Sequence, residues 1–121
     1  MANLSPTQQT GQAAEAMACD YLQKQGLRLV VPNYRCRLGE IDLIMQDEEG
    51  IVFVEVRYRN SLAFGGGLYS VTASKQNKLL RTARYYLQQK KLTDTIDCRF
   101  DVIAITSQLG KVSVEWVKNA F

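Results

Sequence analysis

The sequence predicts a single α/β domain in which a mixed β-sheet is flanked by helices in the order αβββαββ. Apolar residues recur at helical spacing in two stretches of the chain. In the segments that follow each stretch, apolar residues instead alternate with polar ones, as in strands. A length of 121 residues and a hydrophobic content of 46% suffice for one buried core, which favours one domain over residues 1–121. Helices interspersed with strands favour a sheet covered by helices.

Two helices are expected from their caps and apolar stripes. The first begins near Ser5, a residue type that caps helices, and ends before Gly26, a typical residue after a helix end. The second begins after Thr72 or Ser74, either of which can cap it, and runs to about Lys91.

The strands are bounded by turn residues. Turns are predicted at Asp47–Gly50 and Leu109-Gly110, and the segment Asn60–Ser70, with Gly65–Gly67 inside it, is predicted to be a loop. Five strands are expected over Leu27–Arg35, Glu40–Gln46, Ile51–Tyr58, Cys98–Thr106 and Lys111–Val117.

Composition excludes several classes of protein. The three cysteines, Cys19, Cys36 and Cys98, are widely spaced, and the chain has no histidine, so neither a redox CxxC motif nor a Cys/His zinc site is present. Residues 1–12 lack the basic start and apolar run of a secretion signal, and no segment is long enough to span a membrane. We therefore expect a cytoplasmic protein with reduced thiols and no membrane partner.

Two carboxylates interrupt apolar strands. Glu55 lies on the strand face that it shares with Phe53, and Asp42 lies between two aliphatic residues. In the strand of Asp42, alternation predicts Ile41, Leu43 and Met45 on one face and Glu40, Asp42 and Ile44 on the other. A carboxylate in an apolar segment costs free energy unless a partner compensates for its lost hydration.

A hairpin would make Asp42 and Glu55 neighbours, and a divalent cation would relieve their repulsion. Mg²⁺ prefers oxygen ligands and retains water, so we predict a site for Mg²⁺ or Mn²⁺ at this pair. The alternative is equally consistent with the spacing: the two carboxylates pair with Arg57, Arg35 or Arg37 and serve only packing or solubility.

The strand motifs Gly39–Ile44 and Val52–Arg57 resemble those of the YraN family of uncharacterised bacterial proteins. The resemblance covers nearly the whole chain, and its further matches are Gly11, Glu15, Asn33, Lys75 and the run Arg99–Val102. That family is similar in pattern to the PD-(D/E)XK superfamily, which includes restriction endonucleases and archaeal Holliday junction resolvases. The resemblance implies a restriction-endonuclease-like fold and metal-dependent cleavage of DNA.

Roles follow from the resemblance position by position. It implies that Asp42 and Glu55 are catalytic metal ligands and that Glu15 on the first helix supplements them; otherwise Glu15 is a solvent-edge residue. Arg57 stands where the superfamily pattern has Lys, and it can bind phosphate but cannot act as a base. Lys75 is a catalytic substitute for that Lys or, equally, an ordinary surface residue.

Basic residues favour a nucleic-acid partner, although the net charge of +3 is too small to identify one. The second helix has no acidic residue, and its basic residues are Lys75, Lys78, Arg81, Arg84, Lys90 and Lys91. With Arg35, Arg37, Arg57 and Arg59 they are predicted to form a phosphate-binding rim around the acidic centre. The simpler interpretation is a solvated helix surface.

The resulting hypothesis is a Mg²⁺- or Mn²⁺-dependent endonuclease that hydrolyses phosphodiesters in DNA, including structured or branched DNA. The alternative is a nucleic-acid-binding or scaffolding module that has the same fold and no catalysis. Cleavage of branched DNA would require two active sites and therefore a homodimer, but the sequence alone does not indicate a dimer surface.

Overall fold

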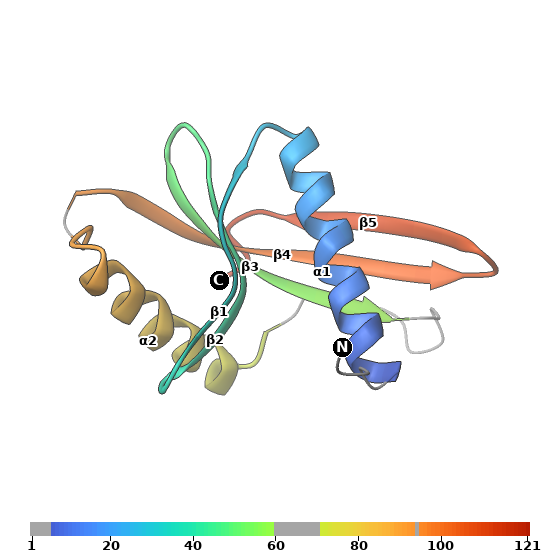
Figure 1. The fold of residues 1–121 in the computed structure, drawn as a ribbon, viewed down its shortest axis with the longest axis horizontal. Coiled ribbons are helices and arrows are strands. Elements are labelled where there is room, and N and C mark those ends of the chain that lie inside the picture. Colours follow the sequence, from blue (N-terminus) through green and yellow to red (C-terminus); the bar gives the residue numbers. More distant parts are fainter. Residues whose placement is uncertain (1–5, 60–70, 94) are drawn as a thin grey trace, which may run out of the picture.

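The chain forms two helices and five strands in the predicted order (Figure 1). The structure is a computed structural model that describes residues 6–59, 71–93 and 95–121, with side chains from residue 11 onward. The elements are α1 (Pro6–Lys24), β1 (Arg28–Cys36), β2 (Gly39–Gln46), β3 (Gly50–Arg59), α2 (Ala73–Gln89), β4 (Asp97–Gln108) and β5 (Lys111–Val117). No helix in these ranges is both long and apolar enough to cross a membrane.

The sheet is mixed and has the strand order β1-β2-β3-β4-β5. Every neighbouring pair is antiparallel except β3 and β4, which run parallel. Parallel neighbours need a long crossover connection, and α2 lies in it. The two helices cover opposite faces of the sheet (Figure 1).

The core has two halves, one on each face of the sheet. The α1-side core contains Ala14, Ala18, Leu22, Leu27, Leu43, Met45, Val52, Val54, Ile103 and Ile105. The α2-side core contains Ile41, Ile44, Ile51, Phe53, Leu79, Ala83, Tyr86, Leu87 and Phe100. The alternation predicted for β3 is therefore confirmed, because Val52 and Val54 pack toward α1 and Ile51 and Phe53 pack toward α2.

The helix ends agree with the predicted caps where the structure describes them. The Thr72 hydroxyl accepts a hydrogen bond from the backbone N–H of Lys75 at 3.2 Å, so Thr72 rather than Ser74 caps α2. Gly26 follows the end of α1 with a φ of 102°, a conformation that favours glycine. The predicted cap Ser5 and the glycines Gly65–Gly67 lie outside the described residues.

One prediction about β2 was wrong. Ile41 packs in the α2-side core, whereas Leu43 and Met45 pack in the α1-side core. The ladder between β2 and β3 ends at the pair Leu43↔Val54, so Ile41 lies beyond that ladder and, among the described residues, pairs only with Tyr34 of β1. Strict alternation holds only along a regular ladder, which explains why it fails at Ile41.

A buried carboxylate ties β4 to β5 and to the chain that follows. Asp101 is fully buried and accepts hydrogen bonds from Arg99 Nε at 3.0 Å, Trp116 Nε1 at 2.9 Å and the Asn119 N–H at 3.0 Å. Arg99 also donates from Nη1 to Asp47 Oδ2 at 2.7 Å, in the turn between β2 and β3. These bonds satisfy the buried charge and give the Arg99–Val102 run a structural role.

Candidate metal and phosphate site

Asp42 lies just beyond the point where β2 stops pairing with β3. Its side chain, rather than a backbone carbonyl of β2, accepts the hydrogen bond from β3 at this point. Its Oδ2 accepts a hydrogen bond from the backbone N–H of Val56 at 2.8 Å. This bond fixes the Asp42 carboxylate beside β3, near Glu55, a residue that is only 9% exposed. The structure therefore brings together the two carboxylates that the strand patterns predicted to be neighbours.

Two cations converge on one oxygen of Glu55. Lys75 Nζ and Arg57 Nε each lie 3.6 Å from Glu55 Oε1, which is the range of an ion pair rather than of a hydrogen bond. Lys75 reaches this position because the Thr72 cap starts α2 beside the end of β3. Both cationic side chains are partly exposed, so they also face solvent at the rim of the site.

Burial raises the pKa of both carboxyl groups above the ordinary value. For Glu55, burial is the largest cause and the charge of Asp42 adds to it, while Lys75 and Arg57 oppose the rise in pKa. For Asp42, burial again raises the pKa most, against the Val56 N–H and the charge of Lys75. The two groups repel each other in a poorly hydrated place, which is the electrostatic condition that favours a bound cation.

A third carboxyl group comes from α1. Burial raises the pKa of Glu15 most, and the charge of Asp42 adds to it, while Asn33, which lines the same pocket as Glu15, lowers it. Asn33 adopts a φ of 49°, a left-handed conformation that asparagine tolerates. We call Glu15, Asp42 and Glu55 the carboxylate site.

The carboxylate oxygens of this site suit a hard divalent ion that takes only some of its ligands from the protein. No three Asp, Glu, Cys or His side chains of the described residues lie close enough together to surround a metal ion. Mg²⁺ is commonly held by one or two carboxylates and completes its shell with water and substrate phosphate. Asp42 and Glu55 therefore fit such an ion, with Glu15 beside them.

The other predicted basic residues lie apart from the carboxylate site or at its border. Arg35 pairs with Glu40 at 3.3 Å on the surface. Arg37 and Lys78 are exposed, and neither forms an ion pair with a described residue. Arg59 ends β3, and within the described ranges its buried Nε, like that of Arg57, has no hydrogen-bond partner. Among the described residues, the ion pair of Arg57 with Glu55 is present, whereas Arg35 and Arg37 pair with neither Asp42 nor Glu55.

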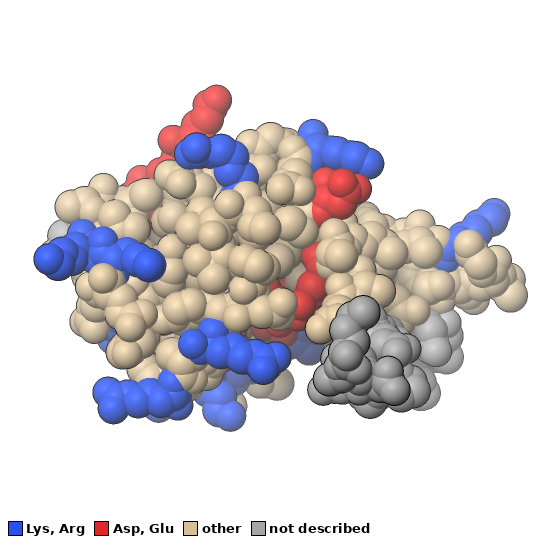
Figure 2. Space-filling view, in the orientation of Figure 1, with Lys and Arg blue, Asp and Glu red and all other residues tan. Residues whose placement is uncertain are grey.

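The molecular surface shows the corresponding charge distribution. In Figure 2, acidic side chains line a hollow near the middle of the visible face, and lysines and arginines gather at its lower left, where α2 and the β1–β2 hairpin overlap in Figure 1. Exposed basic residues of α2 include Lys78, Arg81 and Arg84.

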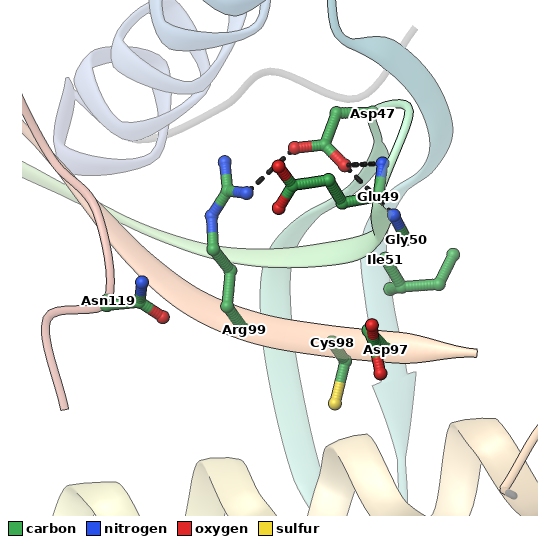
Figure 3. A pocket seen from close by; sticks show the side chains of 8 residues that line it. All are labelled: Asp47, Glu49, Gly50, Ile51, Asp97, Cys98, Arg99 and Asn119. Carbon is green, nitrogen blue, oxygen red and sulfur yellow. Dashed lines mark hydrogen bonds and ion pairs between the residues drawn. The ribbon is translucent and has the colours of Figure 1, made fainter.

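A separate polar hollow lies at the opposite end of β3 (Figure 3). It has a volume of about 170 Å³ and is lined by Asp47, Glu49, Gly50, Ile51, Asp97, Cys98, Arg99 and Asn119. Burial alone would raise the pKa of Asp47, but the N–H groups of Glu49 and Gly50 and the Arg99 guanidinium lower it. Because the Asp47 and Arg99 side chains already satisfy each other, we assign this hollow a structural role.

Two features of the site were not predicted from the sequence. The Val56 N–H holds Asp42, and Asn33 approaches Glu15 from β1. A backbone donor leaves no trace in residue types, because every residue except proline has one. Asn33 follows Pro32 inside a strand. This pair of turn-forming residue types indicates an irregular backbone at that point of the strand, and it was the available sign from residue types that Asn33 is unusual.

The raised pKa values predict an unusual dependence of stability on pH. A folded chain whose carboxyl groups have raised pKa values binds more protons than the unfolded chain, so these groups reduce stability as pH rises through the raised pKa values. We expect Asp42→Asn to raise the melting temperature of metal-free protein by a few degrees near neutral pH. The gain should vanish at acid pH, below the ordinary carboxyl pKa.

Thermal unfolding in chelator at neutral and acid pH measures this difference. The amide oxygen of Asn can still accept from the Val56 N–H, so the substitution changes charge more than it changes hydrogen bonding. A gain that is equal at both pH values would contradict the electrostatic interpretation.

The chain is similar to proteins of several bacteria over most of its length. A UPF0102 protein of Nitrosococcus oceani is 50% identical over 111 residues, which cover 92% of this chain and 90% of the relative. The UPF0102 protein YraN of Escherichia coli is 53% identical over 116 residues, covering 95% and 86%. A UPF0102 protein of Legionella pneumophila is 47% identical over 115 residues, covering 95% and 96%.

The sequence model of the uncharacterised protein family UPF0102 matches residues 14–105. The matched stretch runs from α1 into β4 and includes Glu15, Asp42, Glu55 and Lys75. The similarity to YraN proteins that the two strand motifs predicted is thereby confirmed. The chain belongs to the UPF0102 family.

Proposed function

We propose that this protein is a metal-dependent nuclease that hydrolyses phosphodiester bonds in DNA, with structured or branched DNA as its substrate. The observation that supports this most directly is the pairing of two mostly buried carboxylates, Asp42 and Glu55, with Lys75 and Arg57 beside them. Similarity in pattern to PD-(D/E)XK enzymes also supports it. The free cysteines agree with a reducing compartment, and we place the activity in the cytoplasm.

In this proposal Asp42 and Glu55 would hold Mg²⁺ or Mn²⁺, and Glu15, whose pKa is raised by burial and by the charge of Asp42, would assist them. A bound ion of this kind polarises a phosphoryl oxygen and lowers the pKa of coordinated water. The hydrogen bond from Val56 keeps Asp42 fixed beside β3, so the carboxylate needs little reorganisation on binding. Burial of Glu55 limits competing hydration.

Lys75 and Arg57 have a complementary role. Both place positive charge at the rim of the carboxylate site, where the phosphate of a bound strand would lie. The planar guanidinium of Arg57 would bind phosphate oxygens, whereas Lys75 would supply a compact charge that can orient water or stabilise the leaving oxygen. The exposed basic residues of α2 would contact neighbouring phosphates, which makes affinity fall with salt.

Lys75 can be tested against a matched residue on the same helix. We expect Lys75→Ala to lower the rate of cleavage by about 10²-fold, since one charge next to the reacting phosphate is lost. Lys78→Ala removes an exposed lysine of α2 that has no ion pair with Glu55, and it should only weaken binding, most at low salt, without lowering the rate of the bound complex. Single-turnover cleavage of labelled duplex, flap and four-way junction DNA in Mg²⁺ measures both.

The control for this assay is the same reaction in chelator, which should be silent. Equal rates for the Lys75 and Lys78 variants would remove Lys75 from the mechanism. If the wild type leaves every one of these DNA forms intact in both Mg²⁺ and Mn²⁺, the proposed nuclease activity is wrong.

A second function is favoured by one observation. Glu55 is already neutralised by Lys75 and Arg57, so the site can persist without a metal ion. A nucleic-acid-binding or scaffolding module would use these cations for phosphate alone. It predicts salt-dependent DNA binding that is unchanged by chelator and is never followed by cleavage.

A further inference from the structure

The outer edge of β5 differs from the other edge of the sheet. β1 carries Pro32, a register shift between Leu29 and Val31, and the left-handed residue Asn33, all of which hinder pairing with another strand. β5 has no proline, and its register with β4 is unbroken from Lys111 to Val117. Among the described strands β5 pairs with β4 alone, so its far side is a regular edge.

The hairpin turn determines which groups of β5 face outward. Leu109 and Gly110 have φ values of 51° and 78°, which is typical of a two-residue type I′ turn. In such a turn the flanking pair, Gln108↔Lys111, exchanges both backbone hydrogen bonds. The N–H and C=O groups therefore point toward β4 at Lys111 and away from it at the alternate residues Val112 and Val114.

We propose that β5 pairs antiparallel with β5 of a second copy of this chain, with the twofold axis at Ser113. In this register Lys111 lies opposite Glu115 of the second copy, and Val112 lies opposite its Val114. Each pair occurs twice because of the symmetry, and Ser113 faces itself. Opposite charges and β-branched residues directly across a ladder stabilise it, so the strand is complementary to itself at every position from 111 to 115.

The surroundings of these side chains fit this partner. Val114 packs against the α1-side core, whereas Val112 on the same strand face is 49% exposed, so pairing would extend that core across the axis. Lys111, Ser113 and Glu115 are exposed on the other face and are free to form the polar pairs. The short overlap makes an interface at the low end of the usual size range, so the dimer depends on protein concentration.

The dimer would form one continuous ten-strand sheet, since each copy contributes five strands. Glu55 is in register with Val102 of β4, which pairs with Val117 of β5. With strands ~4.8 Å apart and a rise of ~3.3 Å per residue, the two carboxylate sites would lie roughly 35 Å apart in a flat sheet. The use of this spacing to cleave two DNA strands rests on the proposed nuclease function. The dimer itself does not.

Charge reversal tests the pairing without using nuclease activity. Sedimentation equilibrium of the full chain over about a hundredfold range of concentration should show a reversible wild-type dimer. Lys111→Glu or Glu115→Lys alone should weaken it about tenfold or more, because each creates two like-charged pairs. An equimolar mixture of the two variants should recover the dimer as a heterodimer, and Arg84→Glu on α2 is the matched control that should leave it intact.

The register is tested by cross-linking. In a chain whose three native cysteines are replaced by serine, Ser113→Cys should form a disulfide-linked dimer under mild oxidation, whereas Gln108→Cys on the β4 side of the hairpin should not. A wild type that stays monomeric throughout, or a dimer that neither charge reversal weakens, would overturn the proposal. Equal cross-linking at both positions would overturn the register.

Discussion

Replacing Asp42 by Asn is expected to lower metal-dependent cleavage of DNA by at least about 10³-fold, because the substitution removes one of the two carboxylates that would hold the ion. The fold should persist, since the amide oxygen can still accept the hydrogen bond from Val56. DNA binding should be retained, because the basic residues are untouched. Single-turnover cleavage and a binding titration on the same DNA separate the two effects.

The matched control is Glu40→Gln, which lies two residues away on β2 and also loses a single negative charge. Glu40 is exposed and, among the described residues, forms an ion pair with Arg35 alone. Burial is the main cause of the raised pKa of Asp42 and the charge of Glu40 only a lesser one, so this variant should cleave near the wild-type rate. If Asp42→Asn and Glu40→Gln have equal activity, a contaminating nuclease or another site is responsible for the cleavage.

Replacing Asp101 by Ala should have the largest effect on stability. Asp101 accepts from Arg99, Trp116 and the Asn119 backbone, and its loss leaves the Arg99 guanidinium with one carboxylate fewer in a mostly buried place. Removing one partner of a buried ion pair typically costs about 3–5 kcal/mol. The free energy of unfolding in urea measures this cost.

Asp97→Ala is the comparison for Asp101→Ala, since Asp97 is an exposed carboxylate at the start of the same strand. It should change stability by less than about 0.5 kcal/mol. The structural account of the Arg99–Val102 run would fail if the two variants unfolded at the same urea concentration.

The strand patterns predicted the neighbourhood of Asp42 and Glu55 because alternation and a short turn determine which side chains can meet across a hairpin. They could not show that the ladder stops at Leu43, because the end of a ladder depends on the twist of the whole sheet. The same limit explains the wrong face for Ile41 and the unpredicted bond from Val56 to Asp42.

The contacts made by the helices depend on tertiary packing. Alternation within the strands carries no information on how α1 crosses the sheet, so the approach of Glu15 to Asp42 and Asn33 required the structure. The sequence alone allows a catalytic or a surface role for Lys75, and the structure adds that its ammonium group lies 3.6 Å from Glu55 Oε1. Charge alone cannot show whether Arg35 and Arg37 lie at the rim of the carboxylate site, and the structure places Arg35 in a surface pair with Glu40.

The central claim is that Asp42 and Glu55 together bind a divalent ion, and a calorimetric titration with Mn²⁺ tests it most directly. The titration would compare wild type, Glu55→Gln and Glu40→Gln, each with a non-cleavable oligonucleotide present so that phosphate can complete the shell. We predict saturable binding to wild type and Glu40→Gln that is lost in Glu55→Gln. Binding that is equal in all three proteins, or absent from all three, would contradict the claim.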